Sequence, residues 1–217
     1  MRINEIFVSI QGEGPQSGRR SLFIRMSGCN LKCSFCDSTY ATKTFFELLV
    51  DEVVEIVERA YRDGIRNIIW TGGEPLMQFK DIKDVIEKGP LGICHSVETN
   101  GTIMVPDDTF DLMVISPKEE RVTTDEMLAT LGKWISEYGG NKCFKPVITY
   151  ENMNWWMQWA HDNPMQQIYF MPMTIQPVTD LSIRDHDMMV IRIIHAMHGY
   201  GVNGAVSPRL HVIYKVR

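Results

Sequence analysis

Short apolar runs of strand length alternate along this chain with longer segments whose apolar residues recur at helical spacing. The clearest pair is the run SLFIRMSG at 21–28 and the amphipathic segment at 44–64. Within that segment Thr44 and Glu47 are expected to form a capping box, and Gly64 is expected to end the helix. Strands that alternate with helices favour a parallel sheet with right-handed crossovers, so we expect an α/β fold.

The same alternation continues through the rest of the chain. About six or seven parallel strands would fit an incomplete α/β barrel or an open α/β sheet, and 217 residues suit a single domain spanning 1–217. In both architectures ligands gather at the carboxyl ends of the strands. We expect further strands at 66–73, 94–101, 110–118, 142–149, 168–173 and 209–216, and helices at 79–88, 123–138, 151–162 and within 181–198.

Composition narrows the class of protein. Hydrophobic residues make up 44% and charged residues 23%, which is ordinary for a soluble globular protein. A net charge of −5 disfavours direct nucleic-acid binding, because neutralising phosphates requires cations. Residues 1–14 lack the apolar core of a signal peptide, and no apolar run approaches the ~20 residues of a membrane span. We therefore expect a cytoplasmic protein that binds neither membrane nor nucleic acid.

Three of the five cysteines, Cys29, Cys33 and Cys36, fall in one Cys-x3-Cys-x2-Cys stretch. Iron–sulfur cubes are normally held by four thiolates, so three would leave one iron open to a small molecule. A structural zinc site is the alternative, because Cys-x2-Cys also suits zinc. Zinc would need a fourth ligand from elsewhere in the chain, the candidates being Cys94, His95 and Cys143. Otherwise Cys94 and Cys143 are expected to be structural.

Polar and glycine-rich clusters end several of the apolar runs, namely SGCN, TGGEP, ETNG and SPK. The cysteine spacing after one strand, with Gly-Gly-Glu-Pro at 72–75 after the next, resembles the radical S-adenosylmethionine (SAM) superfamily. The resemblance implies an incomplete (β/α) barrel of the radical SAM type, in which helical connections can be modified. It also implies a [4Fe–4S] cluster on the three cysteines, with SAM chelated to the open iron.

The resemblance assigns residues to SAM as well. Gly72, Gly73 and Glu74 stand where the superfamily contacts the amino group of SAM. Glycines allow close backbone approach, and a carboxylate or carbonyl accepts hydrogen bonds from an ammonium. Three strand-end residues are expected near the SAM ribose or carboxylate, with simple strand-end caps as the alternative. These are Glu98 and Asn100 in ETNG, and Ser116 in SPK.

Four stretches narrow the resemblance further: FVSIQGEGPQSGRRSLFIRMSGCN, the CDS after the last cysteine, TIQPV at 174–178 and SPRLHVIY at 207–214. Together they resemble the 7-carboxy-7-deazaguanine synthase family of 7-deazapurine (queuosine-type) biosynthesis. That family implies 6-carboxy-5,6,7,8-tetrahydropterin as substrate, ring contraction with loss of ammonia, magnesium dependence and a homodimer. An electron donor such as flavodoxin is the expected protein partner.

The family pattern also assigns substrate residues: Gln11, Glu13, Arg25, Gln176 and His211. A carboxylate such as Glu13 matches the amino group and ring N–H of a pterin, and the guanidinium of Arg25 suits its carboxylate. The bland alternatives are a turn with an exposed Glu, and an Arg paired with an acid.

Ser38 stands where the family most often has Thr, and is the expected magnesium ligand; a turn residue is the alternative. The rival enzyme is a glycyl-radical activating enzyme, but Asp37-Ser38 replaces its usual His-Asn pair and QGEG is foreign to it. The non-catalytic rival is a zinc-binding module. The resemblance is weakest over the Met- and Trp-rich region 150–173. Within it, five residues at helical spacing are expected to pack a helix or an interface: Met153, Trp155, Trp156, Met157 and Trp159.

Overall fold

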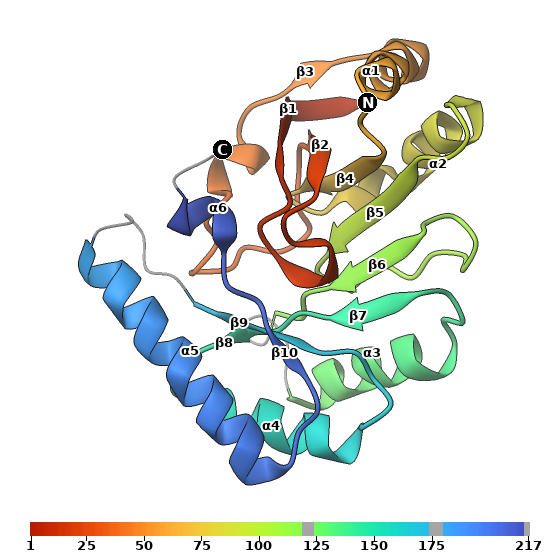
Figure 1. The fold of residues 1–217 in the computed structure, drawn as a ribbon. Helices are drawn as coiled ribbons and strands as arrows, with labels where there is room; N and C mark the ends of the chain where they lie inside the picture. Colours follow the sequence, from red (N-terminus) through yellow and green to blue (C-terminus); the bar gives the residue numbers. More distant parts are fainter. Residues whose placement is uncertain (119–123, 174–179, 215–217) are drawn as a thin grey trace.

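The computed structural model describes residues 1–118, 124–173 and 180–214 (Figure 1). Its main feature is a seven-stranded sheet with the order β3-β1-β2-β4-β5-β6-β7. From β2 to β7 each neighbouring pair is parallel, whereas β1 runs antiparallel to both β2 and β3. The strands are β1 (Arg2–Ile10), β2 (Arg20–Met26), β3 (Phe46–Glu47), β4 (Asn67–Gly72), β5 (Cys94–Thr99), β6 (Leu112–Ile115) and β7 (Lys142–Phe144).

A small parallel sheet continues the arrangement beyond β7. It has the order β10-β9-β8, and a bridge between Phe144 and Ile168 links the two sheets. Across the described residues the strands follow an open curve and do not close into a barrel. The expected α/β fold, an incomplete barrel built on a parallel sheet, is therefore confirmed. The three strands are β8 (Val147–Ile148), β9 (Tyr169–Pro172) and β10 (Ala205–Val206).

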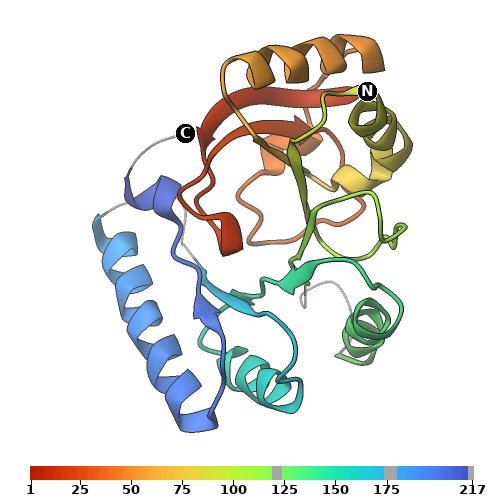
Figure 2. The same cartoon turned by 45° about the vertical axis from the view of Figure 1, so that its right-hand side comes forward.

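Helices α1 to α5 lie around the outside of the curved sheets (Figures 1 and 2). Helices α1 and α2 pack against each other, as do α4 and α5. None of the described helices combines the length and apolarity needed to cross a membrane. The helices are α1 (Val50–Arg62), α2 (Phe79–Lys88), α3 (Thr124–Ser136), α4 (Met153–Asp162), α5 (Asp180–Tyr200) and α6 (Leu210–Ile213), with 3-10 turns η1 (Gly14–Gln16), η2 (Thr39–Thr42) and η3 (Pro75–Gln78).

The core lies between the outer helices and the sheets. Strand β6 is buried at every position and β4 over its first four residues, as expected for central parallel strands covered by helices. Helix α4 contributes Trp156, Met157 and Trp159 to this core, and Trp156 packs edge-on against Trp155 and Trp159. The expectation that this segment packs a helix is therefore confirmed.

Two local expectations were wrong at the start of α1. The helix begins at Val50, where the backbone N–H of Leu49 donates to Glu52 Oε2 at 2.7 Å, and no capping box forms at Thr44. Thr44 instead accepts a hydrogen bond from Asn4 of β1 at 2.8 Å, and the following β3 pairs with β1. Residues 44–47, which the sequence pattern assigned to the first helical turn, therefore contact β1 near the edge of the sheet.

The expected last strand at 209–216 is also wrong. Residues 210–213 form the short helix α6, and the backbone N–H of Leu210 donates to the Gly12 carbonyl at 3.0 Å. A Cβ on Gly12 would lie 2.1 Å from the His211 ring, so this helix sits directly on the QGEG loop. The alternating apolar residues of this segment therefore form a helix that packs on a loop, and residues 210–213 pair with no strand. A further strand, β1, was not expected because most of its residues are only half-buried.

Candidate active site

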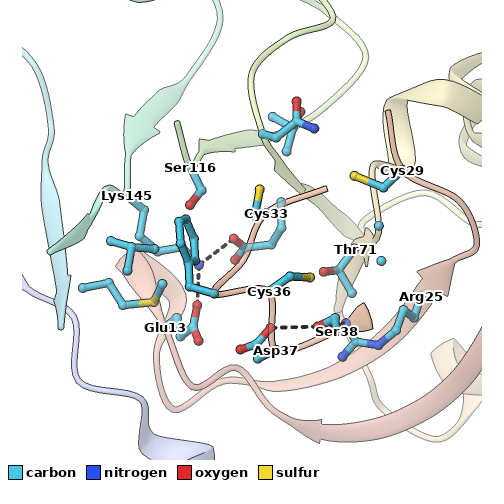
Figure 3. A pocket seen from close by; sticks show the side chains of 18 of the residues that line it. Glu13, Arg25, Cys29, Cys33, Cys36, Asp37, Ser38, Thr71, Ser116 and Lys145 are labelled. Carbon is cyan, nitrogen blue, oxygen red and sulfur yellow. Dashed lines mark hydrogen bonds and ion pairs between the residues drawn. The ribbon is translucent and has the colours of Figure 1, made fainter. Parts of the chain in front are cut away.

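A cavity of about 640 Å³ opens at the carboxyl ends of the parallel strands. It is walled by the cysteine loop after β2, the QGEG loop after β1, the ends of β4, β5 and β6, and the C-terminal segment (Figure 3). Almost every site residue expected from the sequence lines this one space. The lining includes Gln11, Glu13, Arg25, Cys29, Cys33, Cys36, Ser38, Gly72, Gly73, Glu98, Asn100, Ser116 and His211.

The three clustered cysteines lie on one irregular loop at the cavity wall. Cys36 is exposed and Cys29 and Cys33 are half-buried, and all five cysteines of the chain, each in a described segment, are free of disulfides. Among the described residues no three Cys, His, Asp or Glu side chains converge as ligands on a single metal ion. An iron–sulfur cube does not require such convergence, because each thiolate binds a different iron. Three accessible thiols around one cavity therefore fit a cluster.

The Gly-Gly-Glu segment packs directly against the start of the cysteine loop. The backbone N–H of Glu74 donates to the Gly28 carbonyl at 2.8 Å, and that of Gly73 to the Met26 carbonyl at 3.3 Å. A Cβ on Gly72 would lie 2.2 Å from Met26 O, and one on Gly73 would lie 2.0 Å from Gly28 O. The two glycines are thus required by the close approach of two backbones, and this contact positions the first cysteine.

Glu74 is fully buried and does not line the cavity. Its carboxylate accepts hydrogen bonds from the backbone N–H of Leu76 at 3.0 Å, the Thr99 hydroxyl at 2.9 Å and the backbone N–H of Asn100 at 2.7 Å. Burial raises its pKa, and the two backbone N–H groups oppose that shift. The side chain of Glu74 therefore braces the end of β5 against the turn after β4.

Asn100 links that brace to the cysteine loop. Its Nδ2 donates to Asn30 Oδ1 at 2.9 Å, and its Oδ1 accepts from the Thr102 hydroxyl at 2.7 Å. Asn30 in turn donates to the Thr102 hydroxyl at 2.8 Å. This triangle of polar side chains holds residue 30, directly after Cys29, in register with the end of β5.

A group of charged side chains occupies the opposite part of the cavity, around Glu13. Lys145 Nζ donates to Glu13 Oε2 at 2.5 Å and to Glu98 Oε2 at 2.6 Å (Figure 3). Gln11 donates to Glu98 Oε1 at 3.0 Å and accepts from the Glu13 backbone N–H at 3.2 Å. The structure thus places Glu98 beside Glu13, and both carboxylates share one ammonium.

The second oxygen of Glu13 faces the C-terminal segment. It accepts from Arg209 Nε at 3.0 Å and lies 3.9 Å from His211 Nε2, while the same guanidinium donates to Asp37 Oδ2. Burial by itself would raise the pKa of Glu13, but the charges of Lys145, Arg209 and His211 hold it well below its usual range. Glu13 is therefore an ionised acceptor, and Arg209 connects it to the loop that carries the cysteines.

Arg25 lies at a different point of the wall, close to Ser38. Its Nε donates to Glu5 Oε1 at 2.7 Å, and its terminal nitrogen approaches Ser38 Oγ at 3.5 Å. Ser38 Oγ donates to Asp37 Oδ1 at 2.9 Å. Arg25 is therefore paired with an acid, as the bland interpretation expected, and it still lines the cavity.

Sequence reasoning missed several charged residues of this wall. Lys145 and Lys118 both line the cavity, and Lys118 donates to Ser116 Oγ at 2.7 Å. Burial lowers the pKa of Lys118, and the charge of Lys145 lowers it further. A signal was present, because Lys145 interrupts an expected strand just as Arg25 does. Gln176 lies outside the described residues.

Comparison with known proteins agrees with this geometry. Residues 23–128 match the model of the radical SAM superfamily. A 7-carboxy-7-deazaguanine synthase from Thermoplasma acidophilum is 30% identical over 221 residues, covering 98% of this chain and 96% of the relative. One from Hyperthermus butylicus is 40% identical over 126 residues, covering 55% of this chain, and the match spans about half of that relative, 52%.

The crystal structure of QueE from Escherichia coli has the same fold. It superposes with a TM-score of 0.64 at 21% identity, covering 97% of this chain and 94% of that one. Fold, cysteine loop and superfamily match together define a radical SAM enzyme, which implies a [4Fe–4S] cluster and SAM. Within that superfamily, the chain belongs to the 7-carboxy-7-deazaguanine synthase family. This membership sets aside the glycyl-radical activating enzyme and the zinc module.

Proposed function

We propose that this enzyme converts 6-carboxy-5,6,7,8-tetrahydropterin to 7-carboxy-7-deazaguanine with loss of ammonia. One observation carries the proposal: a single cavity joins three cysteine thiols, a pair of carboxylates and an arginine. The thiols suit a cluster, the carboxylates suit the N–H edge of a pterin, and the guanidinium suits the carboxylate of the substrate. The cavity therefore has complementary chemistry for the cofactors and for both ends of the substrate.

Cys29, Cys33 and Cys36 would hold the [4Fe–4S] cluster. When bound, the cluster and SAM supply a radical that removes a hydrogen atom from the substrate. The contribution of the chain is to fix where that atom points. Because Gly73 and Glu74 are hydrogen-bonded to the residues just before Cys29, the loop that binds the cluster and the turn that binds SAM form one rigid unit.

The SAM end of the cavity is assigned to Gly72, Gly73, Asn100 and Ser116, which line it close to the cysteine loop. Glu74, which was assigned to SAM by the family pattern, would support this end indirectly, because its carboxylate accepts three hydrogen bonds in the interior and its backbone N–H donates to the Gly28 carbonyl. Glu98 was expected at this end, yet it shares Lys145 with Glu13. Its position favours a role at the substrate end.

At the substrate end, Glu13 and its neighbour Gln11 would accept the amino group and ring N–H of the pterin. Carboxylate oxygens have several acceptor directions, so Glu13 retains capacity beside Lys145 and Arg209. Arg25 would bind the substrate carboxylate with the nitrogen that now approaches Ser38. His211 and Gln176 are assigned to the remaining edge of the ring.

Several finer features belong to the same proposal. Ser38 Oγ, next to Arg25 and Asp37, would ligate a magnesium ion whose main ligand is the substrate carboxylate, because a neutral hydroxyl binds weakly by itself. The enzyme would act in the cytoplasm as a homodimer in queuosine-type biosynthesis, with an electron donor such as flavodoxin. The cytoplasmic location is an expectation from the sequence, and the other features are expectations from the family pattern.

The decisive experiment is a turnover assay. The protein is reconstituted anaerobically with iron and sulfide and incubated with SAM, reductant, magnesium and the carboxypterin, and the products are identified by mass spectrometry. We expect 7-carboxy-7-deazaguanine and 5′-deoxyadenosine. Tetrahydropterin without the carboxyl group serves as the matched control and should give no ring-contracted product. Cleavage of SAM that leaves the carboxypterin unchanged would refute the proposed substrate.

A further inference from the structure

One lysine ties together the two carboxylates at the substrate end of the cavity. The Lys145 side chain is 3% exposed, and its ammonium lies 2.5 Å from Glu13 Oε2 and 2.6 Å from Glu98 Oε2. Lys145 occupies the gap between β7 and β8, where its backbone N–H donates to the Ile115 carbonyl at 2.7 Å. A residue fixed at both its backbone and its ammonium is suited to positioning other groups.

Each carboxylate has a second donor that fixes its remaining oxygen. Arg209 Nε donates to Glu13 Oε1 at 3.0 Å, and Gln11 Nε2 donates to Glu98 Oε1 at 3.0 Å. Both carboxylates are therefore held in orientation by two contacts, and Lys145 is the contact that they share. The arrangement brings together two segments far apart in the sequence, the QGEG loop and the end of β5.

The charges around the pair are unequally distributed. Glu13 faces three cationic or titratable groups, whereas Glu98 faces Lys145, the negative Glu13 and the buried Cys143 thiol. Burial raises the pKa of Glu98, the charge of Lys145 opposes that shift, and Glu13 reinforces it. Glu98 is thus the carboxylate that would take up a proton if Lys145 lost its charge. Four more charged or titratable side chains lie near this pair of carboxylates: Arg209, His211, Asp37 and Lys118.

We infer that Lys145 is a positioning residue that keeps Glu13 and Glu98 ionised side by side, so that the substrate's N–H edge meets two acceptors. The inference rests on the proposed function. Two buried carboxylates without a shared cation hold a proton between them. That proton occupies one oxygen and cancels one negative charge of the pair, so one acceptor for the N–H edge of the ligand is lost. Lys145 therefore selects for ligands that are donors on that edge.

The test is Lys145→Met, compared with Lys142→Met as a matched control. Lys142 lies on β7, and its ammonium donates to the Tyr138 carbonyl at 2.6 Å. Carboxypterin binding is measured by calorimetry on the reconstituted enzyme with SAM and without reductant, from about pH 6 to about pH 8.5. Lys145→Met should weaken binding roughly ten- to hundredfold at the acidic end, as expected for loss of a charged hydrogen bond. The loss should shrink as pH rises, while the wild type and Lys142→Met stay flat.

A second measurement does not depend on the substrate. In Lys145→Met the folded pKa of Glu98 rises further above its unfolded value, so folding is favoured at low pH and this stability is lost as pH rises through the folded pKa. Urea unfolding of Lys145→Met should therefore show stability that falls with rising pH relative to Lys142→Met. The double variant Lys145→Met/Glu98→Gln removes the shared proton and should abolish this slope.

The outcomes separate the inference from the proposed function. Wild-type affinity for carboxypterin in Lys145→Met would overturn the positioning role. So would a loss of affinity that is equal at every pH, together with a pH slope of stability that Glu98→Gln does not change. If the wild type fails to bind carboxypterin while the stability slopes behave as described, the proposed substrate is wrong and the charge role of Lys145 stands.

Discussion

Gly73→Ala tests how the cysteine loop is positioned. A Cβ at residue 73 would lie 2.0 Å from the Gly28 carbonyl oxygen and 2.9 Å from the Cys29 Cβ. Both neighbours are close to the backbone, so relief requires the two segments to separate. Separation would also stretch the 2.8 Å hydrogen bond from the Glu74 N–H to the Gly28 carbonyl.

The magnitude follows from these contacts. Overpacking of this kind costs about 1–3 kcal/mol, and the weakened hydrogen bond costs about 1 kcal/mol. The lower conformational entropy of the unfolded chain offsets about 0.4–1 kcal/mol of this loss of stability, because alanine has fewer unfolded conformations than glycine. We expect Gly73→Ala to lower the free energy of unfolding by about 1–3.5 kcal/mol.

The assay is urea unfolding of the cluster-free protein, followed by iron and sulfide analysis after anaerobic reconstitution. Gly132→Ala in α3 is the matched control, because nothing lies within 4 Å of its added Cβ. That exposed helical site should gain about 0.5–1 kcal/mol. Gly73→Ala should lose stability and bind less than the full iron of the wild type. If Gly73→Ala unfolds at the wild-type midpoint and takes up full iron, the close backbone contact does not position the loop.

Three further predictions concern single side chains. Cys33→Ala should abolish the absorbance of the reconstituted cluster, whereas Cys94→Ala should leave it unchanged; loss in both would contradict a cluster held by the three clustered thiols. Arg25→Ala should retain SAM cleavage yet lose most ring-contracted product. The free energy of substrate binding should weaken by roughly 2–5 kcal/mol, as expected when one partner of a charge pair is removed. Ser38→Ala should lower turnover at limiting magnesium, excess magnesium should restore it in part, and Ser38→Thr should behave like the wild type. If Ser38→Ala depends on magnesium as the wild type does, Ser38 is not a ligand of the ion.

The central part of the fold was predictable because its signal is local. Strands β2 and β4 are apolar runs that end in polar or glycine-rich clusters, and helix α1 between them shows clear amphipathic spacing. The failures lie where pairing across the chain decides the structure. Strand β1 is only partly buried, so its pattern is weak, and Thr44 serves the sheet edge through Asn4. Helix α6 packs on the QGEG loop, and no local sequence pattern predicts this long-range contact.

The candidate site shows the same division. Residues with a motif, such as Cys29 and Gly73, were identified because their spacing is specific, and they line one cavity in the structure. Lys145 lies in no motif, and Arg209 lies in SPRLHVIY but was given no role from the sequence. Both matter because they meet Glu13 across more than a hundred residues of sequence. Long-range ion pairs of this kind depend on topology. The sequence can suggest them only by a charge that interrupts an apolar run.

The central claim is that the cavity aims one substrate C–H bond at the SAM end of the site. It is tested by incubating the reconstituted enzyme with carboxypterin deuterated at C6, SAM, magnesium and reductant under anaerobic conditions, and measuring deuterium in 5′-deoxyadenosine by mass spectrometry. We expect one deuterium in 5′-deoxyadenosine for each molecule of 7-carboxy-7-deazaguanine formed. Product formation with no deuterium in 5′-deoxyadenosine would contradict it.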